Sequence, residues 1–201
     1  MPQAGPAVRL LTGFAGFGAG SLNLALSSSV FAASAGPAAP LAVFAGVVAG
    51  AWGLAMLAGA VVFLARERLA GGPWARWVLA GAAAIHLAAI AFTPVAPAAS
   101  NLSLTHLSAL LLTLTIIASL GWLQRAAVRQ RGHGQDNERQ LLPAAPAGAG
   151  VRPGRLLPAA FAGAVLVAGI TTPGLAASTA GQYAVPHGGH NNLMPGGHHQ
   201  R

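Results

Sequence analysis

Residues 102–123 read LSLTHLSALLLTLTIIASLGWL and contain no charged side chain. A helix of about 20 predominantly apolar residues is long enough to cross the hydrocarbon core of a bilayer. The stretch is followed by Arg125, Arg129 and Arg131. An arginine at the centre of a membrane helix costs about 2.5–3.5 kcal/mol, so these side chains are expected to remain in water. The stretch therefore predicts a transmembrane helix with a defined direction.

The composition of the whole chain agrees with a membrane protein. Of its 201 residues, 54% are hydrophobic and only 7% are charged, whereas a soluble domain carries about 25% charged residues. The net charge of +8 comes from arginines that separate apolar runs, so we predict a lipid bilayer and no nucleic acid as the partner. The absence of lysine and the abundance of Ala, Gly and Pro are typical of a GC-rich bacterial genome. We therefore expect a bacterial inner membrane protein.

Five apolar runs predict an all-α fold, a polytopic integral membrane helix bundle. The helices are expected at 10–33, 41–65, 78–95, 102–123 and 156–175, within a transmembrane domain that covers residues 1–181. Residues 124–155 lack apolar periodicity and are expected to form a cytoplasmic loop. Residues 182–201 are rich in Gly and His and are expected to form a disordered extracytoplasmic tail, because they have no means of burying a core.

The first run has two interpretations. Ala33-Ser34-Ala35 resembles the cleavage site of a secretory signal peptide. The apolar part is longer than the 7–15 residues of a signal core, and Gly16 and Gly20 have the spacing that lets helices approach closely. We favour a retained helix, and cleavage within residues 1–35 would leave the remaining topology unchanged.

The arginines predict the orientation of the chain. All of them except Arg201 fall in alternate gaps between apolar runs: Arg9; Arg66, Arg68 and Arg76; and Arg125, Arg129, Arg131, Arg139, Arg152 and Arg155. Arginine-rich gaps face the cytoplasm. The amino terminus is therefore predicted to be cytoplasmic and the carboxyl terminus extracytoplasmic.

The tail contains candidate metal ligands, namely His187, His190, Met194, His198 and His199. Neutral imidazoles suit copper, nickel and zinc, and the methionine thioether favours Cu(I). The chain has no cysteine, so thiolate ligands are excluded. The competing interpretation is a solvated tail in which the histidines bind nothing.

Two further histidines, His86 and His106, lie within apolar runs, where an ionisable residue is a candidate functional site. His86 is predicted about 13 Å below the outer end of its helix, and His106 about 6 Å below. Facing each other, they would form a metal pair, part of a proton path or, less favoured, a pair of haem ligands. Alternatively, each is neutral and hydrogen-bonded to Thr93, Thr105 or Ser108.

The remaining polar residues do not predict catalysis. Glu67, Asp136 and Glu138 are the only carboxylates, and all lie at cytoplasmic positions, so no base is expected in the membrane or outside it. A stripe of hydroxyls on run 102–123, formed by Thr105, Ser108, Thr115 and Ser119, would suit a water path. Helix packing is the favoured interpretation of this stripe.

We therefore predict a small membrane protein that is not an enzyme and that handles a transition metal, copper in preference to nickel or zinc. One alternative is a structural or assembly subunit of a membrane complex, which would associate with other subunits or with itself. A small-solute transporter is the third possibility, although no inverted repeat is visible in the sequence.

Overall fold

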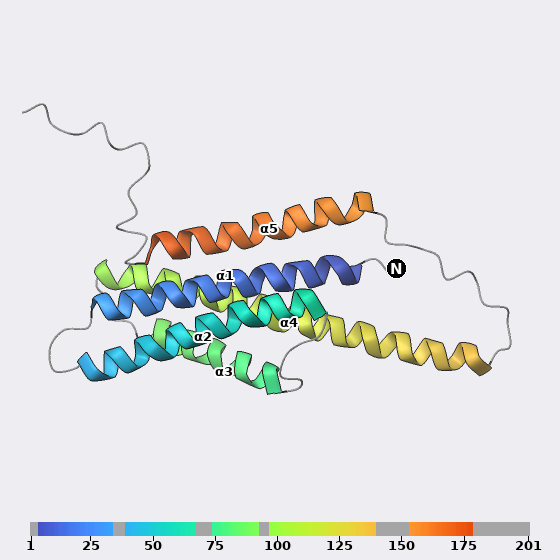
Figure 1. Cartoon of the computed structure of the whole chain (residues 1–201), viewed down its shortest axis with the longest axis horizontal. Helices are drawn as coiled ribbons and strands as arrows, with labels where there is room; N and C mark the ends of the chain where they lie inside the picture. The colour runs from blue at the N-terminus through green and yellow to red at the C-terminus, as the bar shows by residue number, and fades with distance from the viewer. Residues whose placement is uncertain (1–3, 34–38, 67–73, 93–96, 140–152, 179–201) are drawn as a thin grey trace, which may run out of the picture.

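The structure is a computed structural model, and it describes residues 4–33, 39–66, 74–92, 97–139 and 153–178. All of the regular elements in these ranges are α-helices (Figure 1). They are α1 (Ala4–Ala32), α2 (Ala39–Arg66), α3 (Trp74–Ala91), α4 (Pro97–Arg139) and α5 (Pro153–Ala176). Each of the five is long and apolar enough to cross a membrane. The predicted all-helical class and the five apolar helices are confirmed.

The ends of α3 and α4 differ from the prediction. α3 ends at Ala91 and not at 95, while α4 begins at Pro97 and not at 102. Proline disfavours the helical conformation at the residue before it, so Pro94 accounts for the early end of α3. Pro97 occupies the first position of α4, where a missing amide hydrogen costs nothing.

α4 also continues past its apolar part to Arg139, so the predicted loop at 124–155 is wrong for residues 124–139. Most of residues 124–130, QRAAVRQ, are good helix formers. Extending an existing helix requires only propagation and not a new nucleus. Figure 1 shows this part of α4 extending beyond the other helices. The rest of the loop, up to residue 152, and the tail at 182–201 lie outside the described residues.

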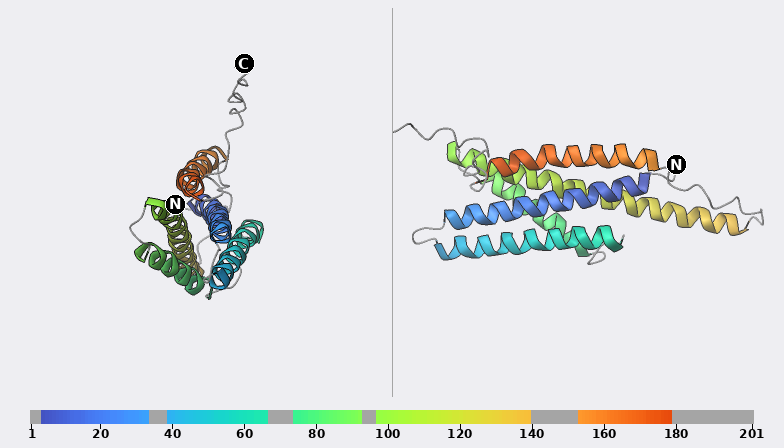
Figure 2. Two further views of the ribbon diagram at one scale, coloured as in Figure 1. Left: turned by 90° about the vertical axis from the view of Figure 1, so that its left-hand side faces the viewer. Right: turned by 45° about the horizontal axis from the view of Figure 1, so that its top comes forward.

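α1 is the central helix of the bundle. It contacts α2, α4 and α5, whereas α3 packs against α4 (Figure 2). In the apolar part of α1, 67% of the residues are buried, against 6% in α5. The core consists mainly of α1 and α4 side chains, among them Ala15, Ala19, Leu22, Ala109 and Leu112.

Glycines allow α1 and α2 to pack closely. A Cβ atom added to Gly53 would lie 2.8 Å from the backbone oxygen of Gly20, and one added to Gly16 would lie 2.9 Å from the Cβ of Ala60. At the other end of the pair, the Ser27 hydroxyl donates to the Gly46 carbonyl at 2.7 Å. The small-residue spacing of Gly16 and Gly20 noted in the sequence is therefore used within the chain, between α1 and α2.

The arginine-bearing ends of the helices lie together. Figure 1 shows the amino termini of α1, α3 and α5 and the carboxyl terminus of α2 at the same end of the bundle, from which α4 extends. Arg9, Arg66 and Arg76 belong to these termini, and Arg125 lies just beyond the apolar part of α4. We refer to this end as the arginine end.

Candidate functional site: a buried histidine pair

The two histidines of the apolar helices meet between α3 and α4. The Nδ1 atoms of His86 and His106 lie 3.1 Å apart. Their ring centroids are 5.4 Å apart, and the ring planes are inclined by 52°. His86 is buried, with 4% of its surface exposed, and His106 is half-buried. Of the arrangements considered from the sequence, the structure has the one in which the two rings face each other.

A hydrogen bond between two Nδ1 atoms constrains the protons of both rings. One Nδ1 must carry a hydrogen and donate, while the other must be unprotonated and accept. Two neutral rings therefore adopt different tautomers. The Nε2 atom of each ring can act as a second donor or acceptor. The two rings therefore differ in protonation, and the pair has the chemistry to pass a proton or to bind a metal ion.

The distances of the two histidines from the ends of their own helices are the reverse of those predicted. With the observed helix ends, His86 lies about 7 Å from the end of α3, and His106 lies about 13 Å from the start of α4. Figure 1 shows that α4 starts further out than α3 ends, which brings the two rings to one level. The error came from the helix ends, which prolines set, and not from the assignment of the spans.

A threonine beside the pair ties α4 to the end of α5. The single hydroxyl hydrogen of Thr105 has two acceptors within reach, the Gly174 carbonyl at 2.9 Å and, in its own helix, the Asn101 carbonyl at 3.2 Å. Gly174 lies in the last turn of α5, where carbonyl groups lack helical donors. The carboxyl end of α5 therefore lies next to the residue that precedes His106. From the sequence, Thr105 was a possible hydrogen-bond partner of a histidine. Nothing in the sequence indicated that a backbone carbonyl of α5 would accept its hydrogen bond.

Three other hydroxyls of α4, including two of the stripe, bond within the helix. Thr113 donates to the Ala109 carbonyl at 2.8 Å, Thr115 to Leu111 at 2.8 Å and Ser119 to Thr115 at 2.7 Å. Hydroxyls bonded in this way are satisfied by their own helix. The arrangement is the one that the packing interpretation of the stripe predicts.

The separation of the two Nδ1 atoms is close to that of two ligands of one metal ion. Two imidazole nitrogens, each about 2.0–2.1 Å from a tetrahedral ion, lie about 3.3 Å apart. The observed separation of 3.1 Å needs only a small adjustment to reach this value. No third His, Cys, Asp or Glu joins the pair among the described residues. The tail candidates His187, His190, Met194, His198 and His199 lie outside the described residues.

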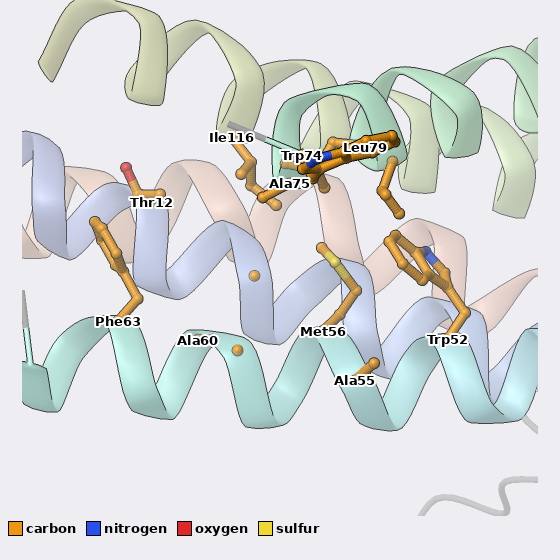
Figure 3. A pocket seen from close by; sticks show the side chains of 13 residues that line it. Thr12, Trp52, Ala55, Met56, Ala60, Phe63, Trp74, Ala75, Leu79 and Ile116 are labelled. Carbon is orange, nitrogen blue, oxygen red and sulfur yellow. The ribbon is translucent and has the colours of Figure 1, made fainter. Parts of the chain in front are cut away.

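A second concave feature lies between α2 and α3. It is an apolar groove of about 320 Å³ (Figure 3). α2 supplies one wall and α3 the other, while α1 and α4 form the floor. We call this feature the α2–α3 groove; its lining residues are Thr12, Gly16, Trp52, Ala55, Met56, Gly59, Ala60, Phe63, Trp74, Ala75, Val78, Leu79 and Ile116.

Comparison with known protein families, with characterised proteins and with solved structures finds no match to this chain. The function must therefore be argued from the two sites themselves.

Proposed function

We propose that this chain is a multi-pass protein of the bacterial inner membrane that binds and passes on a transition metal ion, with copper favoured. The His86–His106 pair is the site within the membrane, and the His/Met tail collects the ion outside. The observation that carries the proposal is the 3.1 Å contact between the two Nδ1 atoms. Ionisable side chains are costly in a membrane span, so two of them in contact across helices favour a functional role.

The position of the pair near the carboxyl end of α5 supports transfer of an ion from the tail. Thr105 is hydrogen-bonded to Gly174 in the last turn of α5, and the chain continues from there toward the tail. Because the arginine end is expected to face the cytoplasm, this opposite end would be extracytoplasmic. The tail and the pair would then lie toward the same side of the membrane.

Charge favours Cu(I) over a divalent ion at the pair. The described side chains around it include no carboxylate, so the charge of the ion would be uncompensated. The energy needed to move an ion into an apolar medium rises with the square of its charge, so a monovalent ion costs about a quarter of a divalent one. Imidazole ligands and the thioether of Met194 are both compatible with copper.

The geometry favours a metal over a haem. Two histidines that ligate a haem stand on opposite faces of the iron, with the macrocycle between the rings. The direct contact of the His86 and His106 rings leaves no such space. The role as an assembly subunit finds less support, because the small-residue faces of Gly16, Gly20 and Gly46 are used between α1 and α2.

The test is a titration of the full-length protein in detergent with Cu(I), in competition with a chelator, and with Zn(II) and Ni(II) as comparisons. Truncation after Tyr183 is expected to remove the tail sites and retain one site. In that truncated chain, His86→Ala or His106→Ala is expected to lower the remaining affinity at least about 100-fold.

The matched control is His133→Ala. His133 belongs to neither proposed site, so this substitution should leave the Cu(I) affinity unchanged. Equal Cu(I) binding in the truncated chain and in its His86→Ala variant would contradict the intramembrane site. Absence of binding by the intact protein would overturn the whole proposal in favour of a structural role.

A further inference from the structure

The α2–α3 groove exists because two consecutive helices do not pack against each other. Neighbours in sequence are usually neighbours in space, yet among the described residues α2 makes close backbone contacts with α1, and α3 with α4. The gap between α2 and α3 has a floor formed by Thr12 and Gly16 of α1 and by Ile116 of α4. Its volume of about 320 Å³ falls within the range of small-molecule sites.

The chemistry of the groove fits a hydrocarbon chain. Apart from Thr12, it is lined by alanine, glycine, valine, leucine, isoleucine, methionine and aromatic residues (Figure 3). The one hydroxyl in the lining, that of Thr12, already donates to the Val8 carbonyl at 2.7 Å. Apart from the indole N–H groups of Trp52 and Trp74, the lining side chains offer no free polar group. A polar occupant would lose its hydrogen bonds to water without replacement.

The length of the groove matches one leaflet of a bilayer. From Phe63 to Trp52 it follows α2 for about 16 Å, and half of the hydrocarbon core measures about 15 Å. A transmembrane helix from another protein would need a seat across both leaflets, about 30 Å long. An acyl chain needs only one leaflet, so the dimensions favour a lipid over a helix.

Charge marks the end of the groove at which a headgroup would lie. Arg66 is exposed one turn beyond Phe63 on the same side of α2, and Arg9 lies one turn before Thr12 on α1. Trp74, 75% exposed, stands at the rim, and tryptophan is enriched at the membrane interface. Basic residues between helices at this level attract anionic lipid headgroups.

We propose that the α2–α3 groove binds the acyl chain of an anionic phospholipid, whose phosphate faces Arg66 and Arg9. The lipid fills the space between α2 and α3, two helices that make no close backbone contact with each other among the described residues. This inference is independent of metal binding, because the groove and the histidine pair share no residue.

The experiment uses the intrinsic fluorescence of the groove. Trp52 and Trp74 line it, and the double substitution Trp77→Phe/Trp122→Phe leaves only these two of the four tryptophans. This full-length variant is reconstituted in phosphatidylcholine vesicles that contain a small fraction of lipid with brominated acyl chains, which quench tryptophan on contact. Brominated phosphatidylglycerol is expected to quench more strongly than the same fraction of brominated phosphatidylcholine. This excess quenching should reach a plateau as the fraction of brominated phosphatidylglycerol rises.

Two substitutions test the site. Gly59→Leu fills the groove, and a Cβ atom at Gly59 meets no other atom within 4 Å, so the helix can accept it. It is expected to remove the excess quenching, while Gly169→Leu on α5, which is equally open, is expected to preserve it. Arg66→Gln is expected to lower the preference for phosphatidylglycerol about fivefold.

Equal quenching by the two brominated lipids would overturn the proposal, as would unchanged quenching in both Gly59→Leu and Arg66→Gln. A groove occupied by a second copy would also overturn it. That outcome would appear as a dimer in native mass spectrometry that Gly59→Leu dissociates and lipid does not displace. Because Arg66 is exposed, its substitution keeps the test decisive even if Gly59→Leu fails to fold.

Discussion

At the residue scale, glycine positions that carry no side chain matter as much as the positions that carry reactive ones. Gly20 and Gly53 face each other where α1 crosses α2, and a Cβ atom on Gly53 would lie 3.0 Å from both the Leu24 nitrogen and its Cγ atom. Backbone atoms cannot move aside as flexible side chains can. The α1–α2 contact therefore depends on glycine at these positions, whereas Gly59, which faces the α2–α3 groove, is not under this constraint.

This difference predicts opposite effects of the same substitution at two positions on α2. Gly53→Ala is expected to destabilise the protein by about 1–3 kcal/mol through overpacking, which lowers Tm by about 2–4 °C per kcal/mol. Gly59→Ala is expected to leave Tm unchanged or to raise it slightly, because alanine is the better helix former. Thermal unfolding in detergent measures both, and equal Tm values for the two variants would contradict the close contact.

At the element scale, α5 is the least buried of the five helices, and the Thr105 side chain of α4 helps to hold its carboxyl end. Only 6% of its apolar part is buried, and it packs against α1 and α4. Gly174 allows the approach, since a Cβ atom there would lie 2.7 Å from the Cβ of Ser108. The Thr105 hydroxyl supplies the hydrogen bond at this contact.

Thr105→Val is expected to loosen the last turn of α5. Interhelical hydrogen bonds in membranes contribute about 0.6 kcal/mol on average, with a maximum of about 1.7 kcal/mol. The predicted consequence is faster hydrogen exchange of the amides near Ala177, whose nitrogen donates to the Pro173 carbonyl. Thr105→Ser keeps the hydroxyl and should exchange at the wild-type rate. Unchanged exchange in Thr105→Val would show that packing alone holds this turn.

At the scale of the whole molecule, the described surface is far more apolar than that of a water-soluble protein, while several polar side chains are buried. Buried positions include Thr12, Asn23 and Ser27, while Phe44 and Phe161 are 65% and 72% exposed. Large exposed apolar surfaces are rare on soluble monomers, and lipid is the solvent that such a surface suits. The arginine end and the end that holds the histidine pair would then lie on opposite sides of the membrane.

The proposed orientation can be tested with single cysteines, because the chain contains none of its own. In intact cells a membrane-impermeant maleimide is expected to label Ala33→Cys and not Ala127→Cys, since the arginine-rich side should face the cytoplasm. Disruption of the membrane should make Ala127→Cys reactive. Ala58→Cys, in the middle of α2, should remain unlabelled throughout. The reverse labelling pattern would invert the topology and place the tail in the cytoplasm.

The sequence alone determined the number and approximate position of the five apolar helices, because hydropathy and arginine placement are properties of one segment at a time. It also singled out His86 and His106, since an ionisable residue in an apolar run stands out by itself. Where a helix ends was predictable only in part: Pro94 and Pro97 shifted the boundaries of α3 and α4 by several residues. The helical continuation of α4 to Arg139 carried no hydropathy signal.

Only the tertiary structure decided that the two histidines touch, that Thr105 reaches the end of α5, and that α2 and α3 enclose a groove. Each of these contacts depends on the rotation and depth of two helices relative to each other. Packing against neighbours sets those quantities, and in this chain the glycines of α1 and α2 determine how closely that packing can occur.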